Sequence, residues 1–219
     1  MHTLNRTPSP RRRIRGRFLL TAGALIFVTV LALTFASAVR RATPGEDGTA
    51  DGYVFQVGSP GPGEAAPPLR LPSDDGTTFD LAGQTGTTVL LYFQEGLMCQ
   101  PCWDQLTDIE ASWDRFNALG IDTIASVTTD PVDLVSRKVA DEGLTSSVLA
   151  DPDRRVSEEW GTLDSGMMGG SFNGHSFIVV GPDGTILWRA DYGGAPDYTM
   201  YLPVTALLAD LEEGLNAGA

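Results

Sequence analysis

The chain has 219 residues, only two of them cysteines, and its formal net charge at pH 7 is −13. Residues 1–41 hold eight arginines and no acidic residue, whereas residues 42–219 hold seven basic and 28 acidic side chains. A domain this acidic repels phosphate backbones, so we expect no nucleic-acid partner. Two cysteines exclude a disulfide-rich scaffold, and the chain is long enough to bury a hydrophobic core without such cross-links.

The first 39 residues predict a membrane anchor. Residues 18–39 form a stretch without charged side chains. This stretch is long enough for a helix that spans a bilayer, and it is longer than the usual apolar core of a cleaved signal peptide. Most of the arginines precede this stretch, which predicts a cytoplasmic tail over residues 1–17 and a redox domain outside the cell membrane. The alternative is a signal peptide cleaved after Ala36-Ser37-Ala38, and it exports the same domain.

The rest of the chain predicts one α/β domain over residues 53–215, after a polar linker over 40–52 and before a short tail over 216–219. In chain order we expect two short strands around the Asp75-Gly76 turn, a strand at 89–93 and a helix over 99–119. A strand at 121–127, a helix over 132–142, a strand at 147–150 and a helix from 151–153 to 160 should follow. The last elements expected are a hairpin of 175–180 with 185–190 and a helix over 201–215. This order predicts a mixed central sheet with helices on both faces.

The two cysteines, Cys99 and Cys102, lie at the predicted junction between a buried strand and a helix. The positive end of a helix dipole favours a thiolate at this position, and Pro101 fits in the first turn, where a missing N–H costs nothing. A disulfide that closes so small a loop restrains little of the unfolded chain, so a purely structural bridge is the weaker interpretation. The pattern therefore predicts a redox pair in which an exposed Cys99 attacks and a shielded Cys102 resolves the mixed disulfide.

Four other residues are candidates for the same site. Glu95 is either a buried base that takes the proton of Cys102 or an exposed loop acid. We expect Met98, Trp103 and His175 to line a groove for a substrate or partner, although Trp103 also fits core packing and a lone histidine is often an ordinary packed residue.

A soft metal site is a further alternative. It would take its sulfur and imidazole donors from Met98, Met167, Met168, His175 and the two thiols. Such donors suit copper, as in Sco-type copper chaperones, although those proteins separate their cysteines by three residues and not by two.

Four segments in sequence resemble the AhpC/TSA family of redoxins. They are residues 58–71, the Asp75-Gly76 turn with the strand at 89–93, residues 149–153, and residues 176–184. The resemblance covers residues 53–215 and implies a thioredoxin-like fold.

The chain departs from that family at the reactive motif. Peroxidatic members carry Pro-x-x-x-Thr/Ser-x-x-Cys. Counting back from Cys102 puts Cys99 at the threonine position and Glu95 at the proline position, and counting back from Cys99 puts Gly96 and Tyr92 there, so neither cysteine fits. Where the family has a peroxide-polarising arginine, this chain has Gly174-His175. The Cys-x-Pro-Cys pattern instead resembles thioredoxins, but no proline precedes Ser176, where those proteins place a cis-proline.

These patterns predict a membrane-anchored, extracytoplasmic dithiol–disulfide oxidoreductase that exchanges disulfides with partner proteins. It needs no organic cofactor or metal, and a membrane protein would supply its electrons. The alternative is an AhpC/TSA-type thiol peroxidase that reduces hydroperoxides. The third, non-enzymatic hypothesis is a Sco-like copper chaperone.

Overall fold

The computed structural model describes residues 48–50 and 52–218. The predicted basic tail, the predicted transmembrane helix at 18–39 and most of the predicted linker lie outside this part. Within it, every helix is too short or too polar to cross a membrane.

A five-stranded sheet with the order β7-β6-β5-β8-β9 forms the centre of the domain. The middle strand β5 (Val89–Phe93) pairs in parallel with β6 (Thr123–Thr128), which pairs in parallel with β7 (Ser147–Ala150). On its other side β5 is antiparallel to β8 (Ser176–Val180), which forms a hairpin with β9 (Ile186–Asp191). All residues of β5 are buried, as expected of a strand covered on both faces. The predicted mixed sheet is confirmed.

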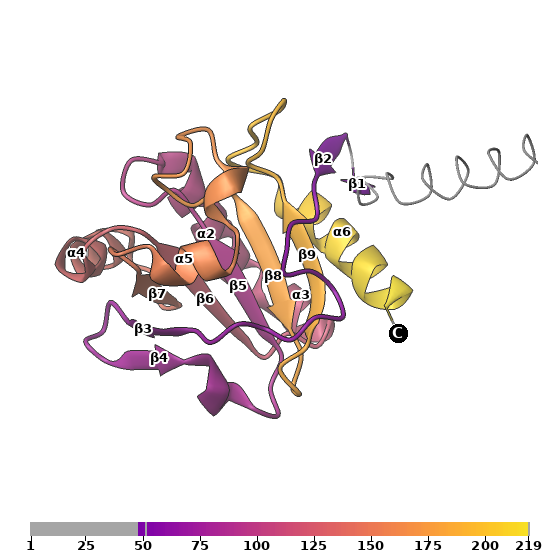
Figure 1. Cartoon of the computed structure of the whole chain (residues 1–219), viewed down its shortest axis with the longest axis horizontal. Helices are drawn as coiled ribbons and strands as arrows, with labels where there is room; N and C mark the ends of the chain where they lie inside the picture. Colours follow the sequence, from indigo (N-terminus) through magenta and orange to yellow (C-terminus); the bar gives the residue numbers. More distant parts are fainter. Residues whose placement is uncertain (1–47, 51, 219) are drawn as a thin grey trace, which may run out of the picture. The chain divides into compact units, whose positions relative to one another are not determined.

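The two faces of the sheet carry different layers (Figure 1). One face packs against α2 (Gln100–Ala111), α3 (Trp113–Ala118), α4 (Val132–Glu142) and α6 (Val204–Ala217). The opposite face packs against α5 (Arg155–Glu159) and the small hairpin of β3 (Arg70–Pro72) with β4 (Thr78–Asp80). Two short 3₁₀ helices, η1 (Leu81–Gln84) and η2 (Leu163–Ser165), complete the connections. Helices on both faces are therefore confirmed as well.

Some boundaries differ from those expected. The helix expected over residues 99–119 is interrupted at Ser112, whose φ of −110° and ψ of 16° lie outside the helical range. A serine there is a weak helix former, because its hydroxyl competes for backbone hydrogen bonds. The strand β1 (Gly48–Ala50), within the expected linker, pairs with β2 (Tyr53–Phe55), and α6 continues past the expected end at residue 215.

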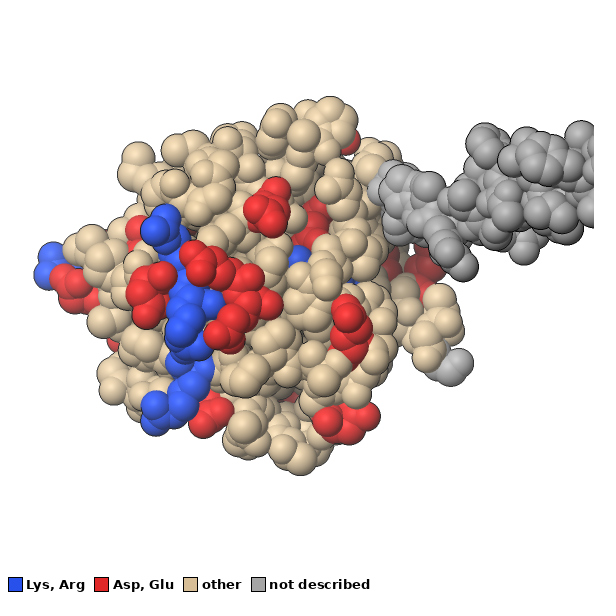
Figure 2. Space-filling model, in the orientation of Figure 1, with Lys and Arg blue, Asp and Glu red and all other residues tan. Residues whose placement is uncertain are grey.

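Acidic side chains surround the basic ones on the surface. On the face in Figure 2, lysine and arginine side chains form a narrow stripe bordered by aspartate and glutamate. Several basic side chains are paired locally, as in the exposed ion pair between Arg155 and Glu159. Exposed ion pairs of this kind contribute little to stability, so the surface charges affect solubility more than they stabilise the fold.

Candidate redox site

The segment that joins β5 to α2 is shaped by the end of the neighbouring strand. Gly96 has a φ of +83°, and a Cβ there would lie 1.9 Å from Oδ2 of Asp130, so only glycine fits. The same Asp130 oxygen accepts hydrogen bonds from the Leu97 amide and the Thr128 hydroxyl, both at 2.8 Å. Asp130 thus fixes the path of the chain into the cysteine motif.

The two cysteines form a disulfide at the start of α2, with their Cα atoms 5.3 Å apart. Cys99 caps the helix and Pro101 lies in its first turn, as the sequence predicts. Cys99 keeps 5% of its surface exposed and Cys102 none, so the expected order is found. Cys99 is nevertheless buried, which corrects the expectation of an openly exposed thiol. An attacking molecule can reach the pair only through the small exposed face of Cys99.

Trp103 does not line a groove, which corrects the expectation for this residue. Its side chain is fully buried in the core, and its indole N–H donates to the Gly96 carbonyl at 3.0 Å. The Lys138 ammonium lies 5.5 Å from the centre of the indole ring and donates to Oε1 of Gln100 at 2.8 Å. The tryptophan and lysine therefore hold α2 against the motif loop and against α4.

His175 is also buried completely, so it does not face an open groove as expected. Its Nδ1 lies 2.9 Å from the Tyr92 hydroxyl, which donates to the Cys102 carbonyl at 3.3 Å. Burial lowers the pKa of His175 to about 3, so the ring is neutral. Both bonds are satisfied when Nδ1–H donates to the Tyr92 oxygen. His175 thus connects β8 to the backbone of the cysteine motif through Tyr92.

Glu95 is buried, with 7% of its surface exposed, so it is not the exposed loop acid of the second alternative. Burial raises the pKa of its carboxyl group, which also accepts a hydrogen bond from the Met167 amide at 3.3 Å. Glu95 lies in the wall of a hollow of about 270 Å³. The other lining residues are Met98, Met167, Met168 and Phe172. Met98, which directly precedes Cys99 in the sequence, is 86% exposed, and neither cysteine lines this hollow.

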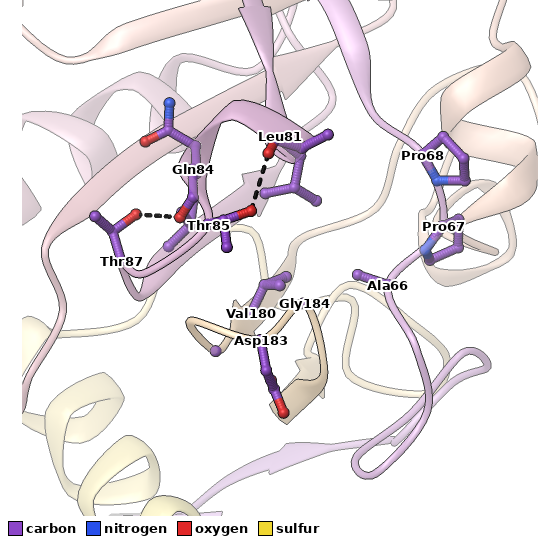
Figure 3. A pocket seen from close by; sticks show the side chains of 13 residues that line it. Ala66, Pro67, Pro68, Leu81, Gln84, Thr85, Thr87, Val180, Asp183 and Gly184 are labelled. Carbon is purple, nitrogen blue, oxygen red and sulfur yellow. Dashed lines mark hydrogen bonds between the residues drawn. The ribbon is translucent and has the colours of Figure 1, made fainter.

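Figure 3 shows a second hollow, of about 330 Å³. It is lined by Val89, the first residue of β5, whereas the cysteine motif follows the last residue of that strand. Among the described residues that line it, Asp183 is the only ionisable one. This second hollow therefore has no direct part in thiol chemistry.

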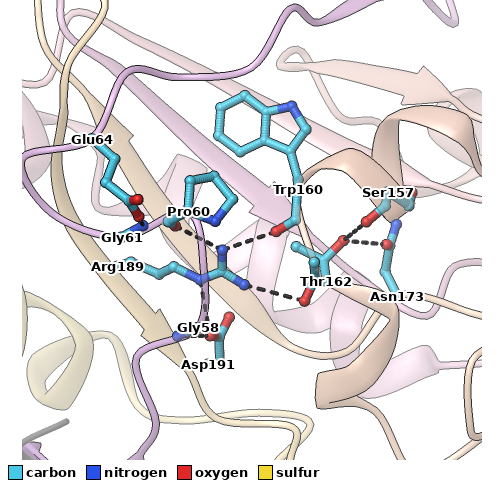
Figure 4. A network of polar contacts seen from close by, with 11 residues as sticks. Gly58, Pro60, Gly61, Glu64, Ser157, Trp160, Thr162, Asn173, Arg189 and Asp191 are labelled. Carbon is cyan, nitrogen blue, oxygen red and sulfur yellow. Dashed lines mark hydrogen bonds and ion pairs between the residues drawn. The ribbon is translucent and has the colours of Figure 1, made fainter. Parts of the chain in front are cut away.

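Arg189 is the buried arginine of the domain, and it lies on the wrong face to act on the cysteines. Arg189 is paired with Ile178 across the β8–β9 ladder, so its side chain lies on the sheet face that packs against α5. Both cysteines belong to the core on the opposite face. The guanidinium pairs with Asp191 at 2.9 Å and donates to the carbonyls of Pro60 and Trp160, also at 2.9 Å (Figure 4). Arg189 therefore does not replace the peroxide-polarising arginine that the sequence lacks.

Metal ligands of the usual kind do not gather in this part of the chain. Among the described residues, no group of three or more His, Cys, Asp or Glu side chains is placed to hold a metal ion.

A match to the AhpC/TSA family covers residues 62–189, more than half of the chain. The chain belongs to the AhpC/TSA family. Peroxiredoxin Bcp of Escherichia coli is 30% identical over 127 residues, which cover 57% of this chain and 81% of Bcp. A Mycobacterium tuberculosis protein whose name places it among the peroxiredoxins is 33% identical over 129 residues, or 58% of this chain and 82% of that protein. This AhpC/TSA protein is thus a peroxiredoxin-like thiol enzyme.

Solved structures confirm the thioredoxin-like fold. AhpC of Enterococcus faecalis aligns with a TM-score of 0.59 at 16% identity, over 71% of this chain and 93% of that one. The peroxidoxin BcpB of Mycobacterium tuberculosis aligns with a TM-score of 0.55 at 17% identity, over 72% and 96%. These identities are low, so the structural likeness concerns the fold alone.

Proposed function

We propose that this AhpC/TSA protein is a thiol peroxidase that reduces hydroperoxides with Cys99 and Cys102. The observation that carries the proposal is a cysteine pair at the N-terminus of α2, joined as an intramolecular disulfide, in a chain of this family. The family match favours the peroxidase over the dithiol–disulfide oxidoreductase that the sequence motif alone predicted.

The reaction balances with the two thiols and one hydroperoxide. The Cys99 thiolate attacks the terminal peroxide oxygen, the O–O bond breaks, and the alcohol leaves with a proton, which gives a sulfenic acid on Cys99. The Cys102 sulfur then attacks the Cys99 sulfur, so that the disulfide forms and water leaves. A dithiol donor must reduce the disulfide before the next turnover.

The structure supports Cys99 as the attacking sulfur for two reasons. It is the more exposed of the pair, and it caps α2, where the helix dipole and unpaired amides stabilise a thiolate. Cys102 is fully buried one turn further on and is bonded to Cys99.

Stopped-flow mixing of the reduced protein with hydrogen peroxide and with cumene hydroperoxide tests the proposal. Trp103 packs in the same core as both cysteines, so its fluorescence should report their oxidation. We expect thiol oxidation on the order of a hundredfold faster than that of free cysteine. Cys99→Ser should abolish the reaction, and Cys102→Ser should stop at a sulfenic acid that dimedone traps. A rate equal to that of free cysteine would refute the peroxidase.

Protein dithiol–disulfide exchange remains the second candidate, because the motif is Cys-Gln-Pro-Cys and the side chain of Arg189 lies on the far face. In that case Cys102→Ser should trap partner proteins as mixed disulfides on a non-reducing gel, while Cys99→Ser traps none. Partner trapping without peroxide reduction would favour exchange over the peroxidase.

We further propose that residues 18–39 anchor the protein and hold the redox domain outside the cell membrane. Protease added to intact spheroplasts should then degrade the domain while a cytoplasmic marker survives. Full protection of the domain would contradict this location.

A further inference from the structure

The hollow beside the cysteines is unusually rich in thioether sulfur. Three of the chain's five methionines, Met98, Met167 and Met168, line it together with Phe172 and Glu95. Their exposed fractions are 86%, 52% and 55%, so all three side chains reach solvent. Of the residues that the structure describes, no leucine, isoleucine or valine lines this hollow. The wall is therefore a set of sulfur donors more than an ordinary apolar surface.

The two segments that carry these sulfurs are tied together. Met98 lies in the loop between β5 and α2, and Met167 and Met168 lie in the loop after η2. Glu95, three residues before Met98, accepts the amide hydrogen of Met167, which joins the two loops directly. The Gly170 amide donates to the Leu163 carbonyl at 3.3 Å and closes the second loop. The two loops that carry the three methionines are therefore hydrogen-bonded to each other.

The chemistry of this lining suits a soft, monovalent cation. Thioethers are neutral, polarisable ligands that select Cu(I) over harder ions. Methionine also has three rotatable side-chain bonds, so exposed side chains can converge on an ion at little steric cost. When ionised, Glu95 supplies one negative charge, and among the described residues it takes part in none of the ion pairs. One carboxylate balances the single charge of Cu(I).

We propose that Met98, Met167 and Met168 form a Cu(I) site, with the Glu95 carboxylate balancing the charge of the ion. The site is independent of the proposed peroxidase function, because it uses thioethers and leaves the disulfide intact. It also differs from the copper site expected from the sequence, because His175 is buried and hydrogen-bonded to Tyr92 and cannot reach this hollow as a ligand.

Metal titration of the full-length protein in detergent, with the disulfide oxidised and oxygen excluded, tests the site. Cu(I) is titrated in competition with bathocuproine disulfonate, and Ag(I) serves in parallel as a soft ion that does not change oxidation state. We expect one equivalent of either ion per chain. Met98→Leu, Met167→Leu and Met168→Leu should each weaken binding by about tenfold or more.

Two controls separate this site from metal binding elsewhere on the chain. Met200→Leu changes a methionine outside the hollow and should leave the affinity unchanged. Leucine conserves most of the methionine volume, so the fold should survive each substitution, which circular dichroism checks. The double variant Cys99→Ser/Cys102→Ser should still bind one equivalent, because the thiols are not ligands.

Three results would overturn the proposal. They are no stoichiometric Cu(I) on the oxidised protein, equal losses in Met200→Leu and the three pocket variants, or binding that disappears in the double serine variant. Binding of an apolar peptide at the hollow without any metal binding would assign the surface to a partner protein instead.

Discussion

The two cysteines share one disulfide and have different surroundings. Cys99 has a small exposed face and lies at the positive end of α2, whereas Cys102 is fully buried behind it. The Tyr92 hydroxyl donates to the Cys102 carbonyl, and the neutral His175 ring is hydrogen-bonded to that hydroxyl. Cys99 is therefore the reactive sulfur because it is partly exposed and caps the helix. Cys102 is buried, and hydrogen bonds hold its backbone in place.

This difference predicts the order in which the reduced thiols react. Limiting iodoacetamide at neutral pH should alkylate Cys99 well before Cys102, because only Cys99 combines access with a stabilised thiolate. Mass spectrometry of the digested protein measures the two sites. In urea both should react alike, which is the internal control. Faster alkylation of Cys102 in the folded protein would reverse the roles of attacking and resolving sulfur.

Glu95 predicts a distinct pH dependence of stability. Burial raises the pKa of its carboxyl group above the value of 4.5 that it has when unfolded, so the folded protein holds this proton more tightly than the unfolded chain. The contribution of Glu95 to the free energy of unfolding is therefore present below pH 4.5 and is lost as pH rises through the folded pKa. Glu95→Gln keeps an acceptor for the Met167 amide and removes the titration.

Urea unfolding of the wild type and Glu95→Gln measures this effect. The experiment covers about pH 4 to 8, the range in which a carboxyl group with a raised pKa titrates. The variant should gain stability relative to the wild type as pH rises. A difference that stays constant over the range would mean that Glu95 has the same pKa in both states.

At the scale of elements, the contact between α2 and α4 positions the motif helix. Lys138 of α4 lies against the Trp103 ring, donates to Gln100 between the two cysteines, and pairs with Glu142. Only 21% of the lysine side chain is exposed, so solvent screens these contacts only in part. Lys138 is thus a basic residue in contact with the motif helix.

Lys138→Met should therefore lower the free energy of unfolding by about 1 kcal/mol, from the lost cation–π contact and ion pair. Chemical denaturation measures it. Arg137→Met on the same helix is the matched control, because its ion pair with Asp133 has side chains 73% and 65% exposed. That control should change stability by less than about 0.5 kcal/mol. Equal losses in the two variants would contradict a specific role for Lys138.

The sequence predicted the elements whose signals are local. The apolar run of β5, the cysteine pair at its end and the β8–β9 hairpin depend on neighbouring residues, and all were found. The surroundings of the motif were not predictable in the same way. Asp130, Lys138 and Met167 approach the motif across 33, 38 and 72 positions of sequence. Hydrophobic periodicity carries no information on such pairings, which is why Trp103 and His175 were expected at a groove and lie in the core.

At the scale of the whole domain, Arg189 joins segments that are far apart in the sequence. Its guanidinium binds the Pro60 carbonyl 129 positions away and the Trp160 carbonyl 29 positions away, and it neutralises Asp191. Asp191 in turn accepts the Gly58 amide hydrogen at 2.8 Å. The buried pair therefore attaches the entry segment and the end of α5 to the edge hairpin of the sheet.

Arg189→Met should destabilise the domain by about 3–5 kcal/mol, because it leaves the Asp191 carboxylate buried without its cation. The double variant Arg189→Met/Asp191→Asn should be less destabilised than the single one, since it removes the unpaired charge and keeps an acceptor for Gly58. Thermal and urea unfolding measure both.

The cysteines lie on the opposite face of the sheet, so the folded fraction of either variant should oxidise at the wild-type rate. A single variant as stable as the wild type would mean that the backbone carbonyls hold these segments without the arginine. A slower oxidation in the folded variant would instead connect the two faces of the sheet, and Arg189 would then belong to the redox site after all.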